Sequence, residues 1–172
     1  MTVSAPASGG VPVMWRITTR YDAVADRLAL TGTLAEGSCR LWLTARLFRK
    51  LLPMLVKWLA EQGAQGAHAD MLHRWAQESA AAALQPSPGV PAPAADSGCD
   101  WLAEAVTLQF ESDRLVLIWV AAEAVQVAAL PLQAHALRQW LHVLKQQCDQ
   151  AGWMNLPWPA WLEVNVAAGS LQ

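Results

Sequence analysis

The chain has 172 residues, of which 54% are hydrophobic and only 15% are charged, and its net charge is −2. Ten tryptophans accompany one tyrosine and two phenylalanines. This composition excludes a disordered chain, a collagen-like repeat and a disulfide miniprotein, and the acidic balance argues against a protein built mainly to neutralise phosphates.

The first half of the chain, residues 13–84, predicts three strands followed by two helices. Apolar and polar residues alternate over 15–21, 28–34 and 39–43, which is typical of half-buried strands. Thr44 then suits the N-cap of a helix. Beyond two glycines, residues 68–84 are rich in Ala and predict a second helix, which forms a hairpin with the first.

Residues 85–100 separate the two halves and contain four of the ten prolines. Such a composition predicts a solvated, extended connector. The second half, residues 101–172, predicts strands at 106–110, 115–121 and 125–130. We expect a helix to begin at Pro131, because proline is favoured at the first helical position. A short C-terminal strand is predicted at 161–166.

The two halves share an order of elements and a register. Residues 17–21 align with 106–110 at an offset of 89, and residues 27–30 align with 114–117 at an offset of 87. The offset changes only in predicted turns, where insertions are tolerated. The sequence therefore predicts one α+β domain made of a tandem βββα duplication, with each antiparallel meander covered by a helix. The alternative is two unrelated segments of similar pattern.

Basic residues gather on the predicted outer faces of two helices. The first helix has no acidic residue between Glu36 and Glu61, and both helices place their cations opposite an apolar arc. A basic ridge of this kind suits an acidic partner, although ordinary solvation of an outer helix face also explains it. The candidate ridge consists of Arg46, Lys50, Lys57, Arg138 and Lys145.

A second candidate surface lies on the predicted first sheet. Arg16 and Arg20 project to one face of their strand, and Arg40 and Trp42 are candidates for the same face. Single-strand nucleic-acid binders combine exposed aromatic and basic side chains on a sheet in this way. This surface carries the alternative function, binding of single-stranded nucleic acid.

Catalytic and metal-binding motifs were sought and none was found. His68, Asp70 and His73 form one cluster of possible metal ligands, but a spacing of five residues places the two histidines poorly on one helix face. We therefore assign no catalytic residue, no metal site and no cofactor. A small-molecule or metal-dependent enzyme centred on this cluster is the third hypothesis.

The first residues lack the basic and apolar regions of a signal peptide, and no apolar stretch approaches the 20 or so residues that span a bilayer. Three cysteines without a C-x-x-C motif make a disulfide framework improbable. We expect a cytoplasmic protein.

These observations favour a non-enzymatic binding or assembly module that acts through protein–protein contacts. The strand at 115–120 is apolar on both faces, so helices or a partner must cover both of them. A protein partner or self-association, including a homodimer, is the expected mode of action.

Overall fold

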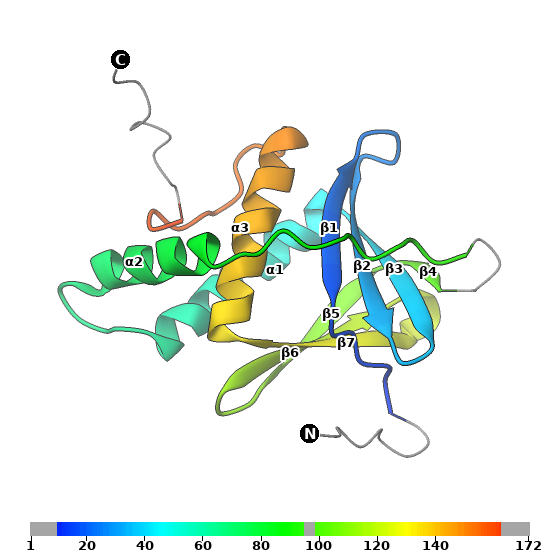
Figure 1. The fold of residues 1–172 in the computed structure, drawn as a ribbon, viewed down its shortest axis with the longest axis horizontal. Helices are drawn as coiled ribbons and strands as arrows, with labels where there is room; N and C mark the ends of the chain where they lie inside the picture. Colours follow the sequence, from blue (N-terminus) through cyan, green and yellow to red (C-terminus); the bar gives the residue numbers. More distant parts are fainter. Residues whose placement is uncertain (1–9, 95–98, 163–172) are drawn as a thin grey trace.

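A computed structural model describes residues 10–94 and 99–162 of the chain. Within this part the order is three strands, two helices, four strands and a helix, with one short 3₁₀ turn before the last strand (Figure 1). The first half contains β1 (Ile17–Asp22), β2 (Arg27–Leu34), β3 (Gly37–Leu43), α1 (Ala45–Gln62) and α2 (Ala69–Ala82). The second contains β4 (Asp100–Leu102), β5 (Ala105–Phe110), β6 (Arg114–Val120), β7 (Gln126–Gln133) and α3 (Ala134–Gln150).

The strands form two separate sheets. The first has the order β1-β2-β3-β4, and the second has the order β5-β6-β7. β1, β2 and β3 pair antiparallel in chain order, and so do β5, β6 and β7, whereas the three-residue β4 joins β3 in parallel. The mixed α+β class and the order of strands and helices agree with the sequence analysis, and β4 is an element that it did not predict.

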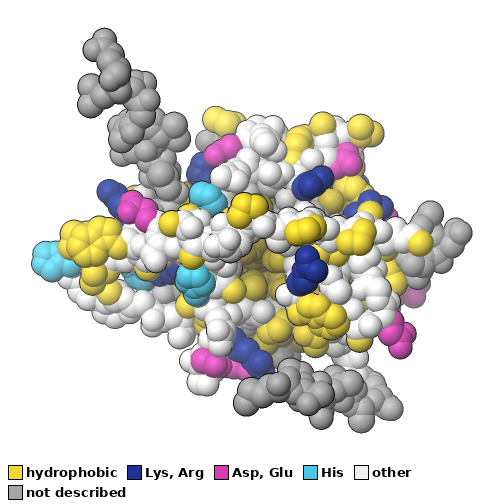
Figure 2. Space-filling model, viewed as in Figure 1, with side chains coloured by type: hydrophobic (Ala, Val, Ile, Leu, Met, Phe, Trp, Pro, Cys, Tyr) yellow, Lys and Arg dark blue, Asp and Glu magenta, His cyan; other side chains and the backbone are white. Residues whose placement is uncertain are grey.

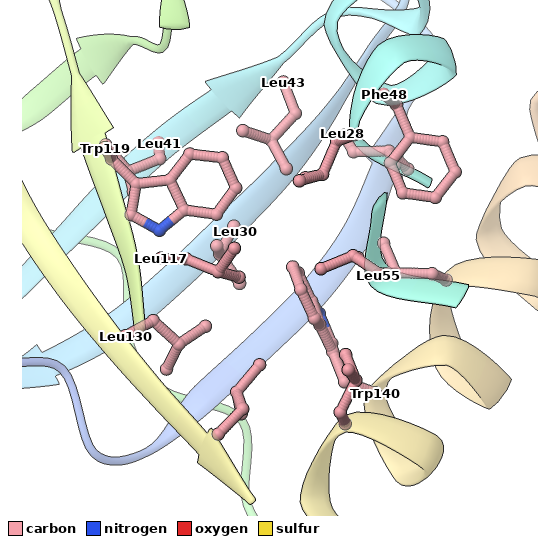
Figure 3. Close-up of a cluster of buried hydrophobic side chains, with 14 of the residues drawn as sticks. Leu28, Leu30, Leu41, Leu43, Phe48, Leu55, Leu117, Trp119, Leu130 and Trp140 are labelled. Carbon is pink, nitrogen blue, oxygen red and sulfur yellow. The ribbon is translucent and has the colours of Figure 1, made fainter. Parts of the chain in front are cut away.

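The two sheets and two of the helices share one hydrophobic core (Figure 3). Leucines from β2 and β3 point toward Leu117 and Trp119 of β6, and the space between them is closed by α1 and α3. Helix α3 packs against β1 as well as β7, so the helix of the second half covers a strand of the first. Apolar burial across both halves is what holds the two sheets together.

The helix α1 begins where the sequence predicts. The backbone of Thr44 is extended, and its side-chain oxygen accepts a hydrogen bond of 3.2 Å from the backbone N–H of Leu47. This bond satisfies one of the N–H groups that a helix leaves unpaired in its first turn.

The predicted start of the last helix at Pro131 is wrong. Pro131 lies inside β7, opposite Val116, and α3 begins three residues later at Ala134. β7 is an edge strand, and Ala129 directs its N–H and carbonyl groups to the outer edge, where they bond to Pro12 and Met14. Because alternate residues face the same edge, the missing N–H of Pro131 costs no bond to β6.

The predicted C-terminal strand is not found at its first residues. Trp161 and Leu162 are buried and lie in a turn, and the rest of the predicted strand, 163–166, lies outside the described residues. In the part of the chain that the structure describes, no helix is long and apolar enough to cross a membrane.

The described part of the connector is extended and runs across the outer side of the first sheet (Figure 1). The backbone N–H of Val90 donates to the hydroxyl of Thr18 at 2.8 Å, and Arg16 donates to the carbonyl of Pro88 at 3.4 Å. The described part of the connector is therefore hydrogen-bonded to β1 and to Arg16, the residue before β1, and is not free in solvent.

Candidate functional site

The groove beside α1, which we call the α1 groove, has a volume of about 650 Å³. One wall is the exposed side of the first three turns of α1, and the other is the loop between β4 and β5 with the first residues of β5. Its apolar side chains include Met54 and Leu102, which are 45% and 39% exposed. Large apolar side chains open to water in a groove are typical of contact surfaces.

Two cations of the candidate ridge, Arg46 and Lys50, line this α1 groove. Glu104 is the one acidic side chain among the lining residues, and within the described residues neither cation forms an ion pair. Helix α1 has no acidic residue in its first turn, so the charged side chains of its amino-terminal half are all positive. The α1 groove thus combines an apolar floor with a basic rim.

The structure does not bring the whole predicted ridge together. Lys57 is exposed farther along α1, outside the α1 groove. Lys145 of α3 is held by Asp149 in an ion pair of 2.8 Å and lies over the ring of Trp158 at 5.8 Å. These contacts make Lys145 part of the packing around the chain after α3.

The predicted exposure of Arg138 is wrong. Its side chain is only 6% exposed because α2 packs against the side of α3 that carries it. The guanidinium donates to the carbonyl of His73 at 3.3 Å, contacts the Nδ1 atom of the same residue at 2.8 Å, and lies over the ring of Trp161 at 5.1 Å. Burial alone lowers the pKa of Arg138, and no acidic group among the described residues pairs with it.

The metal candidates are separated by this packing. His73 is buried against Trp161 and Arg138, whereas His68 and Asp70 are exposed at the start of α2. Among the described residues, no three groups of ligating type lie close enough to hold a metal ion.

A groove of about 410 Å³, the α3 groove, lies between β1, the end of β7 and α3 (Figure 2). In that view hydrophobic side chains occupy a hollow below the connector. Four residues of α3 line it, and each stands 89 positions after a residue of α1 that lines the α1 groove. The matched pairs are Leu47 and Ala136, Lys50 and Gln139, Leu51 and Trp140, and Met54 and Val143. The described connector residues 85–94 border the α3 groove but not the α1 groove.

Three of the four residues of the candidate nucleic-acid face, Arg20, Arg40 and Trp42, line one groove of about 480 Å³ on the first sheet. Residues 89–92 of the connector form its other wall, and Arg16 lies apart from it, bonded to the connector. Basic groups are visible on both sides of the connector in Figure 2.

Asp100 contacts two residues of this face, Arg40 and Trp42, and balances the charge of Arg40. It forms an ion pair with Arg40 and accepts a hydrogen bond of 2.6 Å from the indole of Trp42, while Arg40 lies over the same ring at 4.7 Å. The side-chain hydrogen bond from Arg40 lowers the pKa of Asp100, and the same bond raises the pKa of Arg40. Both groups are charged at neutral pH, and the positive charge of Arg40 is largely balanced.

Eight of the ten tryptophans are buried or half-buried, and those after α3 anchor that segment to the rest of the protein. Trp158 packs against Phe48 of α1 with ring centres 5.7 Å apart, and Trp153 meets Tyr21 edge-on at 6.4 Å. Trp15 and Trp75 are exceptions, because both are more than half exposed. The surplus of tryptophan is therefore mainly a packing feature.

The acidic side chain of Asp100 and the apolar residues of the β4–β5 loop were missed by sequence reasoning. Asp100 was placed in the connector, and only the unpredicted strand β4 brings it beside Arg40. Comparison with protein-family models, with curated proteins and with solved structures finds no match to this chain.

Proposed function

We propose that this protein is a non-enzymatic binding or assembly module that acts through protein–protein contacts at the α1 groove. The observation that carries the proposal is that exposed apolar side chains, Met54 and Leu102, lie beside two cations that form no ion pair within the described residues, in a chain of negative net charge. A partner segment with apolar and acidic side chains complements such a surface.

The relation between the two halves supports this assignment. We propose that the chain arose by duplication of a βββα unit and that the α1 and α3 grooves are equivalent positions in it. Residues 85–89 of the connector border the α3 groove, whereas none of the described connector residues 85–94 lines the α1 groove. The open member of the pair is the one available to another molecule.

Binding of single-stranded nucleic acid has less support. The connector forms a wall over the sheet face, and Asp100 balances the charge of Arg40 and engages Trp42. A labelled oligonucleotide titrated at about 50 mM salt, where phosphate contacts are strong, tests this alternative.

The experiment for the proposed function compares two charge reversals on one helix. Lys50→Glu changes the α1 groove, whereas Arg49→Glu makes the same charge change at a neighbouring exposed residue that does not line it. Partners captured by the immobilised chain are identified, purified and titrated against each variant. We expect Lys50→Glu to weaken binding about tenfold and Arg49→Glu to leave it nearly unchanged.

A partner that binds both variants equally contradicts a role for the α1 groove. Met54→Glu gives a second readout, because it removes an apolar contact and adds an acidic charge to the same surface while leaving the buried side of α1 intact.

A further inference from the structure

We propose that β5 pairs with β5 of a second copy of this chain, and that the α1 groove receives acidic residues of that copy. This inference rests on the proposed function, since it names the partner. The observation behind it is that β5 is an edge strand and that, in the part of the chain that the structure describes, it lacks the protection that the other sheet edges have.

The other three edges of the two sheets are each blocked. At β1, the backbone N–H of Tyr21 donates to Gln147 of α3 at 2.7 Å. At β7, the segment before β1 bonds to Ala129, and Pro131 lacks a donor. β4 has only three residues and begins with a charged Asp100. Short, charged or covered edges of this kind prevent pairing with other chains.

Within residues 10–94 and 99–162, β5 has none of these devices. Its sequence, A-V-T-L-Q-F, contains no charge and no proline, and its register with β6 is regular throughout. Phe110 is 58% exposed. A regular, uncharged and partly apolar edge strand is a template for another strand.

The hydrogen-bonding pattern shows which backbone groups are directed outward. Glu111 donates its N–H to the carbonyl of Arg114 at 2.9 Å, so residue 111 faces β6. Because orientation alternates along a strand, Val106, Leu108 and Phe110 direct their N–H and carbonyl groups to the open edge.

A two-fold axis at Leu108 uses all three of these residues. Leu108 then pairs with Leu108 of the second copy, and Val106 pairs with Phe110 in both directions. Closed two-fold symmetry of this kind is the commonest form of self-association, and it joins the two three-stranded sheets edge to edge.

Charge complementarity favours the second copy as the occupant. In this register Glu111 of the second copy lies opposite Ala105, which lines the α1 groove together with Arg46 and Lys50. The turn that follows β5 carries Glu111 and Asp113 and one cation, Arg114, which pairs with Glu111 at 2.6 Å, so the excess negative charge of the turn comes from Asp113. The two-fold axis repeats this basic-to-acidic contact at both ends of the paired strands.

The register can be tested with two exposed residues, Thr107 and Gln109, which face each other across the axis. In the double variant Thr107→Lys with Gln109→Lys, residue 107 of each copy faces residue 109 of the other, so like charges are opposed at both positions. The variant Thr107→Lys with Gln109→Glu places opposite charges there. Like charges directly opposite one another on paired strands weaken the pairing, whereas opposite charges strengthen it.

Sedimentation equilibrium of the full chain from about 5 to about 200 μM measures the association, with circular dichroism as a check of folding. We expect the wild-type chain to dimerise, the Lys/Lys variant to associate about tenfold more weakly, and the Lys/Glu variant to regain wild-type association. A wild-type chain that stays monomeric over this range overturns the inference. So does a folded Lys/Lys variant that dimerises normally, or a folded Lys/Glu variant that does not recover.

These outcomes are separate from failure of the proposed function. A monomeric wild-type chain that still binds a partner with sensitivity to Lys50→Glu, but not to Arg49→Glu, removes the self-pairing and retains the protein-binding role.

Discussion

The Nη2 atom of Arg138 lies 2.8 Å from the Nδ1 atom of His73, in the packed layer between α2 and α3. No carboxylate among the described residues balances this buried cation. The guanidinium is instead held by the imidazole, by a backbone carbonyl and by the ring of Trp161. These contacts fix α2 to α3 and tie the chain beyond α3 to both helices.

Replacing Arg138 by alanine should therefore loosen α2. The variant loses the cation–π contact and leaves buried acceptors on His73 without a donor, so we expect the free energy of unfolding to fall by about 2 kcal/mol. Urea denaturation measures the loss. Amide exchange of residues 69–82 should be faster in the variant than in the wild-type chain, and this increase should exceed that of α1. Equal exchange in the variant and the wild-type chain contradicts this account.

Two buried tryptophans offer a matched comparison. The indole N–H of Trp140 donates to the hydroxyl of Thr19 at 3.0 Å, whereas that of Trp119 has no acceptor among the described residues. Trp140→Phe leaves the buried hydroxyl without a donor, but Trp119→Phe removes an unpaired donor. We expect Trp140→Phe to cost about 1 kcal/mol more stability than Trp119→Phe, as measured by thermal unfolding.

Alkaline pH should destabilise the protein through two buried thiols. Burial raises the pKa of Cys39 to about 11 and that of Cys148 to about 12, from an ordinary value of 9.0. Above pH 9 the unfolded chain ionises these thiols and the folded chain does not, so their contribution is complete below pH 9 and is lost as pH rises through 11 and 12. Unfolding midpoints measured from pH 8 upward should fall.

The same burial protects these thiols from alkylation. At pH 8 we expect the native chain to react first at the half-buried Cys99, and the urea-unfolded chain to react at all three cysteines. Mass spectrometry after timed iodoacetamide treatment distinguishes the sites. Rapid native modification of Cys148 would show that α3 is not packed as described.

Asp100→Asn should weaken the link between β3 and β4 mainly above acidic pH. The pKa of Asp100 is lowered by Arg40, so its contribution is present above the ordinary value of 3.8 and is lost as pH falls below it. Because both side chains are partly exposed, the effect at neutral pH should stay below about 1 kcal/mol. Stability of the wild-type and variant chains, measured at pH 7 and pH 3, should converge at the lower pH.

The strands were accessible from the sequence because alternation follows directly from one buried face. All six strands predicted within the described meanders are present, and α1 begins beside its predicted cap. Pro131 misled the prediction because proline is favoured both at a helix start and at a strand edge. The local sequence pattern does not distinguish a helix start from an edge strand. Only the position of β7 at the edge of its sheet distinguishes them.

Arg138 shows a second limit of sequence reasoning. A plot of α3 alone places this residue opposite the apolar arc, which is correct for a helix with one covered face. Helix α2 covers another side of α3, and nothing in the sequence of α3 reports this neighbour. Asp100 was missed for a similar reason, because its pairing with Arg40 joins residues 60 positions apart. The basic rim of the α1 groove was found, but its apolar wall depends on the path of the β4–β5 loop.

The parallel pairing of β4 with β3 has a consequence for any attempt to divide the chain. A fragment beginning at residue 100 would carry a strand whose hydrogen-bonding partner is on the other fragment, and its α3 would have lost β1. After cleavage within residues 85–94, the two fragments should stay associated through these contacts. Either fragment expressed alone would expose hydrophobic residues that are buried in the intact protein. The proline-rich segment thus divides the sequence into two halves that do not fold as independent units.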